Sequence, residues 1–126
     1  QAITTAAKVI LGEVRGDVTF NDDRTIFTLK GGKTYRLTFC AAGTFNNATG
    51  SATFSFFNND IGSNVGSTRS TLLPVSNATN QVHTGVLDFI FPITNTQTNL
   101  SINCGVTTGS TLTLKNLQTY LIIQEL

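Results

Sequence analysis

Hydrophobic and polar residues alternate along most of this chain with a period of two. In segment 35–41 the odd-numbered positions are Tyr, Leu, Phe and Ala, and in segment 100–106 the even-numbered positions are Leu, Ile, Cys and Val. Successive side chains of a β-strand point to opposite faces, so this pattern predicts strands with one apolar face. Ten strands are expected, at Ala7–Glu13, Asp17–Phe20, Thr25–Leu29, Thr34–Ala42, Ala52–Asn58, Thr71–Val75, Val82–Ile93, Asn99–Val106, Thr111–Leu114 and Gln118–Gln124.

Residues that favour turns separate these segments. Asn21–Arg24, Lys30–Lys33 and Asn46–Gly50 are rich in Asn, Asp and Gly, whose side chains or backbone freedom suit tight connections. No segment of helical length has the period of about 3.6 residues that a helix requires. Short strands separated by turns at regular spacing are typical of an antiparallel sandwich or barrel. We therefore expect one all-β domain over residues 1–126.

Two of the expected strands are apolar on both faces. In Val82–Ile93, Leu87, Phe89 and Phe91 form one face, whereas Val86, Asp88 and Ile90 form the other. In the last strand, Leu121 and Ile123 oppose Tyr120, Ile122 and Leu126. A strand that is apolar on both faces is usually covered on both, and scattered surface apolar residues are the alternative. Because the pattern recurs on two strands, we favour a second subunit as the cover.

The composition removes several function classes. Charged residues make up 12% of the chain, whereas Thr, Asn, Ser and Gly supply 53 of its 126 residues. The net charge of +1 gives no basic surplus of the kind that drives nucleic-acid binding. We therefore expect no nucleic-acid partner. No apolar run is long enough to span a membrane, so membrane insertion is not expected either.

The two cysteines, Cys40 and Cys104, are expected to lie in different environments. Cys40 is expected on the face of its strand that points away from the core, whereas Cys104 is expected on the apolar face of segment 100–106. Two free thiols are therefore favoured over a disulfide. With one histidine and no paired metal-ligand spacing, the sequence predicts no zinc site and no other cofactor.

Catalytic patterns are lacking as well. His83 is the only histidine, and no nucleophile motif precedes a helix as serine hydrolases require. Asp22 and Asp23 are more typical of a turn than of a calcium site. Three N-glycosylation sequons, at Asn47, Asn77 and Asn99, are as many as this Ser- and Thr-rich composition gives by chance. We expect the protein not to be an enzyme.

The segment Phe27–Leu37, which reads FTLKGGKTYRL, resembles a phrase found in C1q/TNF-like jelly-roll domains of phage and bacterial surface proteins. The strand with Phe54–Phe57, the Ile61-Gly62 step and the turn Pro92–Thr96 resemble the same family in the same order. The similarity covers about residues 25–106. Within this family the chain is most similar to the knob domains of tectivirus vertex spikes.

This resemblance implies an antiparallel jelly-roll sandwich of about ten strands that forms a homotrimer. In the family one sheet faces the three-fold axis, and the strands at Thr34–Ala42, Val82–Ile93 and Gln118–Gln124 would belong to it. The trimer-interface residues implied in this way are Arg36, Thr38, Val86, Asp88, Ile90, Tyr120 and Ile122.

The function implied is that of a virion component, the head of a spike at the capsid vertex that takes part in host attachment. Its partners would be two further copies, other vertex proteins and a host surface receptor. Since the sequence starts with Gln1, we expect the head to be the C-terminal part of a longer, stalked protein. Partner contacts are expected at the loops Asn46–Gly50, Asn64–Ser70 and Ser76–Gln81. The alternative is a carbohydrate-binding or other adhesive module of a bacterial surface protein.

Overall fold

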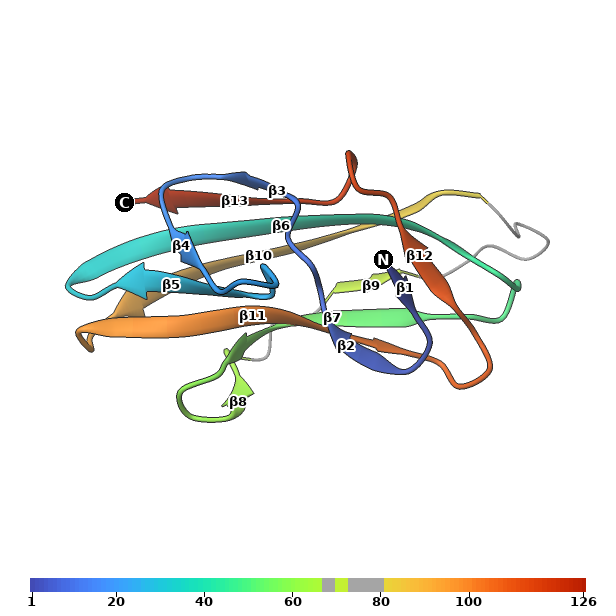
Figure 1. Ribbon diagram of the computed structural model, residues 1–126, viewed down its shortest axis with the longest axis horizontal. Helices are drawn as coiled ribbons and strands as arrows, with labels where there is room; N and C mark the ends of the chain where they lie inside the picture. The colour runs from blue at the N-terminus through green and yellow to red at the C-terminus, as the bar shows by residue number, and fades with distance from the viewer. Residues whose placement is uncertain (67–69, 73–80) are drawn as a thin grey trace.

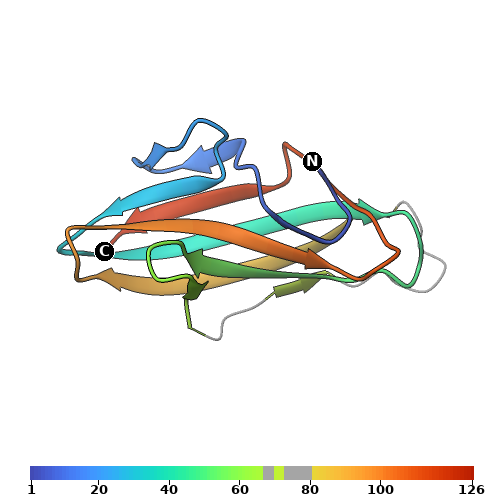
Figure 2. The same cartoon turned by 60° about the horizontal axis from the view of Figure 1, so that its bottom comes forward.

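The computed structural model describes residues 1–66, 70–72 and 81–126, and it confirms the all-β class. These residues form thirteen strands in two sheets, and they contain no α-helix. Two layers are visible in Figures 1 and 2, with the long strands running along the long axis of the molecule. Within the described ranges, no helix is long and apolar enough to cross a membrane.

The first sheet is built around one long strand, β6, which spans Lys33–Phe45. On one side β6 pairs with β10 (His83–Ile93) over eleven residues. On its other side β6 pairs first with β13 and then with β12, which lie end to end along it. The outermost strands on that side are β1 and β3. The bounds of the four strands on that side are Ala2–Ile3 for β1, Glu13–Arg15 for β3, Leu112–Leu114 for β12 and Tyr120–Glu125 for β13.

The second sheet is built around β11, which spans Gln97–Val106. This strand pairs with β5 and β2 on one side and with β7 on the other, and β7 in turn pairs with β8 and β9. All pairings in both sheets are antiparallel except that of β3 with β13. The remaining bounds are Ala6–Lys8 for β2, Thr19–Phe20 for β4, Ile26–Lys30 for β5, Ala52–Asn58 for β7, Ser63–Asn64 for β8 and Ser70–Leu72 for β9.

The core lies between the two sheets and is rich in phenylalanine. Phe39 of β6 contacts Phe54 of β7 across the sandwich, with 5.5 Å between ring centroids. The alternation predicted for segment 35–41 is confirmed, since its four odd-numbered side chains are all buried. The largest fully buried side chains are Phe27, Phe39, Phe45, Phe54, Phe56, Ile3, Leu11, Leu29, Leu37, Leu87 and Leu100.

One expected strand, Ala7–Glu13, is wrong. Its first residues belong to β2 in the second sheet, and its last residue begins β3 in the first sheet. Between them the chain crosses the sandwich, where the Val9 amide donates to the Ile102 carbonyl at 2.8 Å and the Leu11 amide donates to the Arg24 carbonyl at 2.9 Å. Val9 and Leu11 lie in this crossing segment, and their side chains are buried in the core. Two apolar residues two positions apart have the same sequence pattern as the apolar face of a strand, and this pattern led to the wrong prediction.

Each of the other expected strands has a counterpart in the structure, and the structure has two short strands that were not expected. The two-residue strands β1 and β8 were too short to leave an alternating pattern. Of the strand expected at Thr71–Val75, the first two residues belong to β9, and residues 73–75 lie outside the described part of the chain.

The cysteines are placed as expected. Cys104 is buried in the core and Cys40 is half-buried on the outer surface of the first sheet, and both thiols are free. Burial raises the pKa of the Cys104 thiol to about 12, so this cysteine behaves as a small apolar side chain.

Two turns meet at one end of the sandwich, and Gly31 lies where they touch. The Gly31 amide donates to the Thr96 carbonyl at 2.7 Å, and the Gly32 amide donates to the Ile93 carbonyl at 2.8 Å. A Cβ atom on Gly31 would overlap the carbonyl group of Asn95. The predicted turn Lys30–Lys33 therefore needs glycine at position 31 for space and at position 32 for a φ of +74°.

Gly31→Ala should consequently lower the free energy of unfolding by about 1–3 kcal/mol or more, the usual cost of overpacking a tight contact. Gly12→Ala is the matched control, because a Cβ atom there meets nothing within 4 Å, and its change should stay within about 0.5 kcal/mol. Chemical denaturation of both variants measures the difference. Equal stability of the two variants would contradict the close contact between the turns.

Candidate functional site

The outer surface of the first sheet brings together all seven residues that the sequence predicted for a trimer interface. Arg36 and Thr38 lie on β6, Val86, Asp88 and Ile90 lie on β10, and Tyr120 and Ile122 lie on β13. These strands are neighbours, with β6 in the middle. We call this set of seven residues the β6 face.

The register of the strands places these side chains in three rows across the sheet. Asp88, Thr38 and Ile122 lie opposite one another in the central row. Cys40 lies between Val86 and Tyr120 in the row on one side, and Arg36 lies opposite Ile90 in the row on the other side. The β6 face is therefore one continuous surface.

Apolar side chains on the β6 face are open to solvent. Val86 is 57% exposed and Ile90 is 56% exposed, whereas Leu87 between them is 1% exposed. Tyr120 and Ile122 are half-buried. Among the described residues β10 pairs with β6 alone, so it forms one margin of the sheet.

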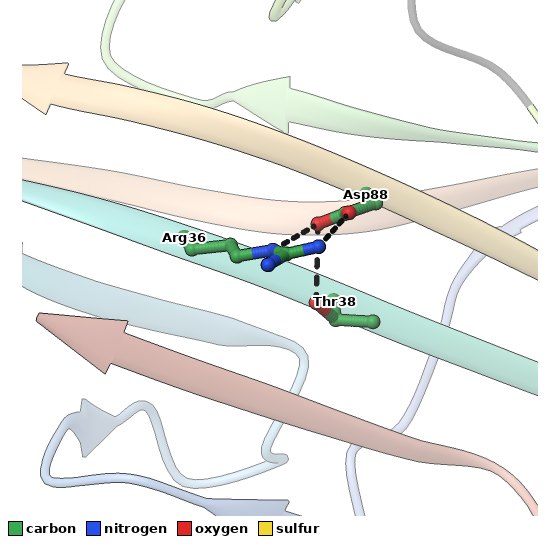
Figure 3. A network of polar contacts seen from close by, with 3 residues as sticks. All are labelled: Arg36, Thr38 and Asp88. Carbon is green, nitrogen blue, oxygen red and sulfur yellow. Dashed lines mark hydrogen bonds and ion pairs between the residues drawn. The ribbon is translucent and has the colours of Figure 1, made fainter. Parts of the chain in front are cut away.

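A network of one ion pair and one hydroxyl lies among these apolar side chains. Figure 3 shows its three members, Arg36, Thr38 and Asp88. The Arg36 guanidinium donates from Nε to Oδ1 of Asp88 at 3.2 Å and from Nη2 to Oδ2 at 2.8 Å. The Thr38 hydroxyl donates to Oδ1 of Asp88 at 3.1 Å. Two parallel bonds from one guanidinium fix the geometry of the carboxylate more firmly than a single contact does.

The network changes the titration of its members. The hydrogen bonds from Arg36 lower the pKa of the Asp88 carboxyl below its ordinary value, with a smaller contribution from the hydroxyl of Thr38. The same contact raises the pKa of Arg36. Both side chains are well exposed, and ion pairs at such positions contribute little to the stability of an isolated chain. The pair therefore gains importance only where something covers it.

Arg15 on β3 extends the same surface, and no pattern in the sequence predicted it. Its guanidinium carbon lies 5.7 Å from the centroid of the Tyr120 ring, within the range of cation–π attraction. Tyr120 also lies opposite Cys40 across the sheet, and the proximity of this thiol raises the pKa of the tyrosine. Arg15 could not be placed beforehand because the parallel pairing of β3 with β13 joins segments about a hundred residues apart.

The residues considered for catalysis do not converge. His83 begins β10, and its ring lies 6.2 Å from that of Phe45, a core residue. Asp23 lies in the turn before β5, where bonds from Thr25 lower its pKa and identify it as a turn residue. The described part of the chain has no group of three His, Cys, Asp or Glu side chains that could hold a metal ion.

Of the loops expected to contact partners, only Asn46–Gly50 is described completely. Asn47 ties this loop to the turn before β12, since it donates to the Gly109 carbonyl and accepts from the Ser110 hydroxyl. Residues 67–69 of the second loop and residues 76–80 of the third lie outside the described ranges.

Comparison with known proteins adds no assignment. No protein-family model matches the sequence, and no curated protein matches it either.

The Asp88 carboxyl should titrate below its ordinary pKa of 3.8, and Arg36→Gln should move its titration upward. The carboxyl carbon resonance of Asp88, followed by NMR against pH, measures both values. Since the folded state favours ionised Asp88, its contribution to stability is present above pH 3.8 and is lost as the pH falls through the lowered pKa. Thr38→Val is the control and should move the pKa less, and an unchanged pKa in Arg36→Gln would contradict the network.

Proposed function

We propose that this chain is the trimeric head domain of a viral spike or fibre, and that its copies meet on the β6 face. The observation that carries the proposal is the continuous strip of exposed and half-exposed apolar side chains around the Arg36–Asp88 pair. Soluble monomers rarely expose large continuous apolar patches, and such patches commonly mark interaction surfaces.

Burial of the apolar side chains would supply the driving force for association. Removing a Val or Ile side chain from water completely stabilises by about 1.5–3 kcal/mol. Val86 and Ile90 have more than half of their surface still to bury, and Tyr120 and Ile122 have a smaller part. Because the same strip is present on every copy, the gain is repeated at each contact of a closed ring.

The ion pair would supply specificity to this interface. Inside a covered face, an arginine or carboxylate without its partner is strongly unfavourable, so only arrangements that keep the pair intact are tolerated. Arg36 and Asp88 are already bonded within one chain. Each copy can therefore present a neutral pair and need not bury a single charge.

The order of the strands supports a jelly-roll arrangement. Four neighbouring strands of the first sheet have the order β3, β13, β6, β10. Four neighbouring strands of the second sheet have the order β5, β11, β7, β9. Neighbours in each sheet come from distant parts of the sequence, as expected for interlocked Greek keys. The parallel pairing of β3 with β13 is a departure from a fully antiparallel roll.

The attachment role follows from the resemblance of segment Phe27–Leu37 and from what three copies can do. Three linked heads raise the avidity for a surface without any new contact. The proposed partners are thus two further copies, other proteins of the capsid vertex and a host surface receptor, and the proposed location is the virion surface. An adhesive module of a bacterial surface protein is the alternative, and it would use the same fold.

The mass of the chain in solution tests the trimer. At micromolar concentration, light scattering should give three times the 13.5 kDa mass of one chain. Ile90→Glu and Val86→Glu should each shift the mass toward that of one chain, because each places an unpaired charge in the covered face.

Ile61→Glu is the matched control. Ile61 is also an exposed apolar residue, at 71%, but it follows β7 in the second sheet. This variant should keep the mass of the unchanged protein. A wild-type chain that is monomeric at these concentrations would overturn the proposal, as would dissociation that is equal in all three variants.

A further inference from the structure

The outer surface of the second sheet has a different chemistry from the β6 face. Thr28, Ser55, Asn99 and Asn103 are partly exposed on the outer side of strands β5, β7 and β11, Ser101 lies on the same side but is buried, and the turn after β7 adds Asn59 and Asp60. Phe57 is the aromatic residue among them, and it lies opposite Ser101. We call these eight residues the amide face.

Hydrogen bonds hold one end of the amide face in a fixed arrangement. The backbone amide of Asn99 donates to Oδ2 of Asp60 at 3.0 Å, and the Asn99 side chain donates to Oδ1 at 2.9 Å. The Thr28 hydroxyl donates to the Asn99 side-chain carbonyl at 2.6 Å. Each Asp60 oxygen accepts one of these bonds, and a carboxylate oxygen can accept two. An exposed acceptor is thereby held in place at this end.

A second chain of bonds orients the other end. The Asn59 side chain donates to the Ser101 hydroxyl at 3.1 Å, and that hydroxyl donates to the side-chain carbonyl of Asn103 at 2.8 Å. Since the carbonyl of Asn103 is taken, its Nδ2 group is directed as a donor. No described residue accepts from this group. Ser101 itself is completely buried, so it acts as an internal link.

This arrangement matches the chemistry of a sugar. A sugar hydroxyl both donates and accepts hydrogen bonds, and the amide face offers a carboxylate acceptor at Asp60 and an amide donor at Asn103. The half-buried ring of Phe57 lies on the same surface and can pack against the apolar face of a sugar ring. Because these side chains are already held by one another, binding costs little conformational entropy.

The few charges and the length of the amide face restrict the class of ligand further. The outward positions of β5, β7 and β11 carry one charged side chain, Lys30, which lies at the end of β5. A strand advances about 3.3 Å per residue, so Asn99 and Asn103 are about 13 Å apart along β11. Asp60 carries the one charge of the amide face itself, and Lys8 of β2 lies opposite Asn103 at its margin. A surface of this length with many amides and hydroxyls and few charges suits a neutral chain of several sugar units better than a highly charged or a very small ligand.

We propose that the amide face binds a neutral oligosaccharide, and that this is how the head recognises a surface. The inference rests on the proposed function in one respect, since it supplies the ligand of an attachment head. Its location is independent of the trimer contact, because the amide face and the β6 face lie on opposite outer surfaces of the sandwich. Both surfaces can therefore be occupied in the same assembly.

The test uses the whole chain and an array of neutral oligosaccharides of glucose, galactose, mannose and N-acetylglucosamine. The strongest binder is then titrated into the isotope-labelled protein and followed by NMR. Shifts should be confined to residues of β5, β7, β11 and the turn at Asn59–Asp60. Asp60→Asn and Asn103→Ala should weaken binding about tenfold or more, the usual loss for a hydrogen bond to a ligand.

Asn116→Ala is the matched control, because Asn116 is an exposed amide between β12 and β13 and lies outside the amide face. Its affinity should equal that of the unchanged protein. Should a variant fail to fold, the shift map of the unchanged protein still decides the location. Shifts on the β6 face, or no binding of any of these sugars at millimolar concentration, would overturn the inference.

The mass measurement separates this inference from the proposed function. A trimer that binds none of the sugars contradicts the amide face alone. A monomer that binds a sugar through the amide face contradicts the trimer alone. Capture of a host protein without any sugar binding would likewise overturn the oligosaccharide and leave the trimer in place.

Discussion

The whole molecule depends on the backbone pairing of β6 with its neighbours on both sides. β6 holds β10 along one side and β12 and β13 along the other, so it joins three strands that come much later in the sequence. Its inward side chains, among them Leu37 and Phe39, are part of the core. Its outward side chains, Arg36 and Thr38, build the centre of the β6 face. A single strand thus determines both the packing of the sandwich and the position of its candidate site.

Local periodicity was sufficient to predict the class of fold, the long strands and the two faces of each long strand, as in Leu87 against Val86 and Ile90. The choice of the β6 face as one set of seven residues came from the family resemblance, which indicated which strands are neighbours. Local periodicity could not predict contacts between segments that are distant in the sequence. Val9 and Leu11 are buried by a crossing between sheets, and Arg15 meets Tyr120 through a parallel pairing. The alternation at Val9 and Leu11 cannot distinguish a crossing from a strand, and the pairing of β3 with β13 leaves no periodic pattern, because each feature depends on how separate segments meet in space.

The low charge of the sequence has different consequences on the two outer surfaces. On the β6 face, the charges of Arg36 and Asp88 neutralise each other and leave an apolar surround. On the amide face, the side chains of Asn59, Asn99 and Asn103 are connected by bonds to neighbouring polar groups. One composition therefore produces one surface suited to burial against protein and one surface suited to polar contacts.

Strand β10 also bears on solubility before any assembly takes place. It is eleven residues long, and among the described strands it pairs with β6 alone. A free strand of this length is a template for pairing with other chains and for fibril growth. Pro92 has no amide to offer to an added strand, and Asp88 keeps a carboxylate in the middle of β10. The same strand that exposes apolar side chains for ordered contact thereby resists uncontrolled aggregation.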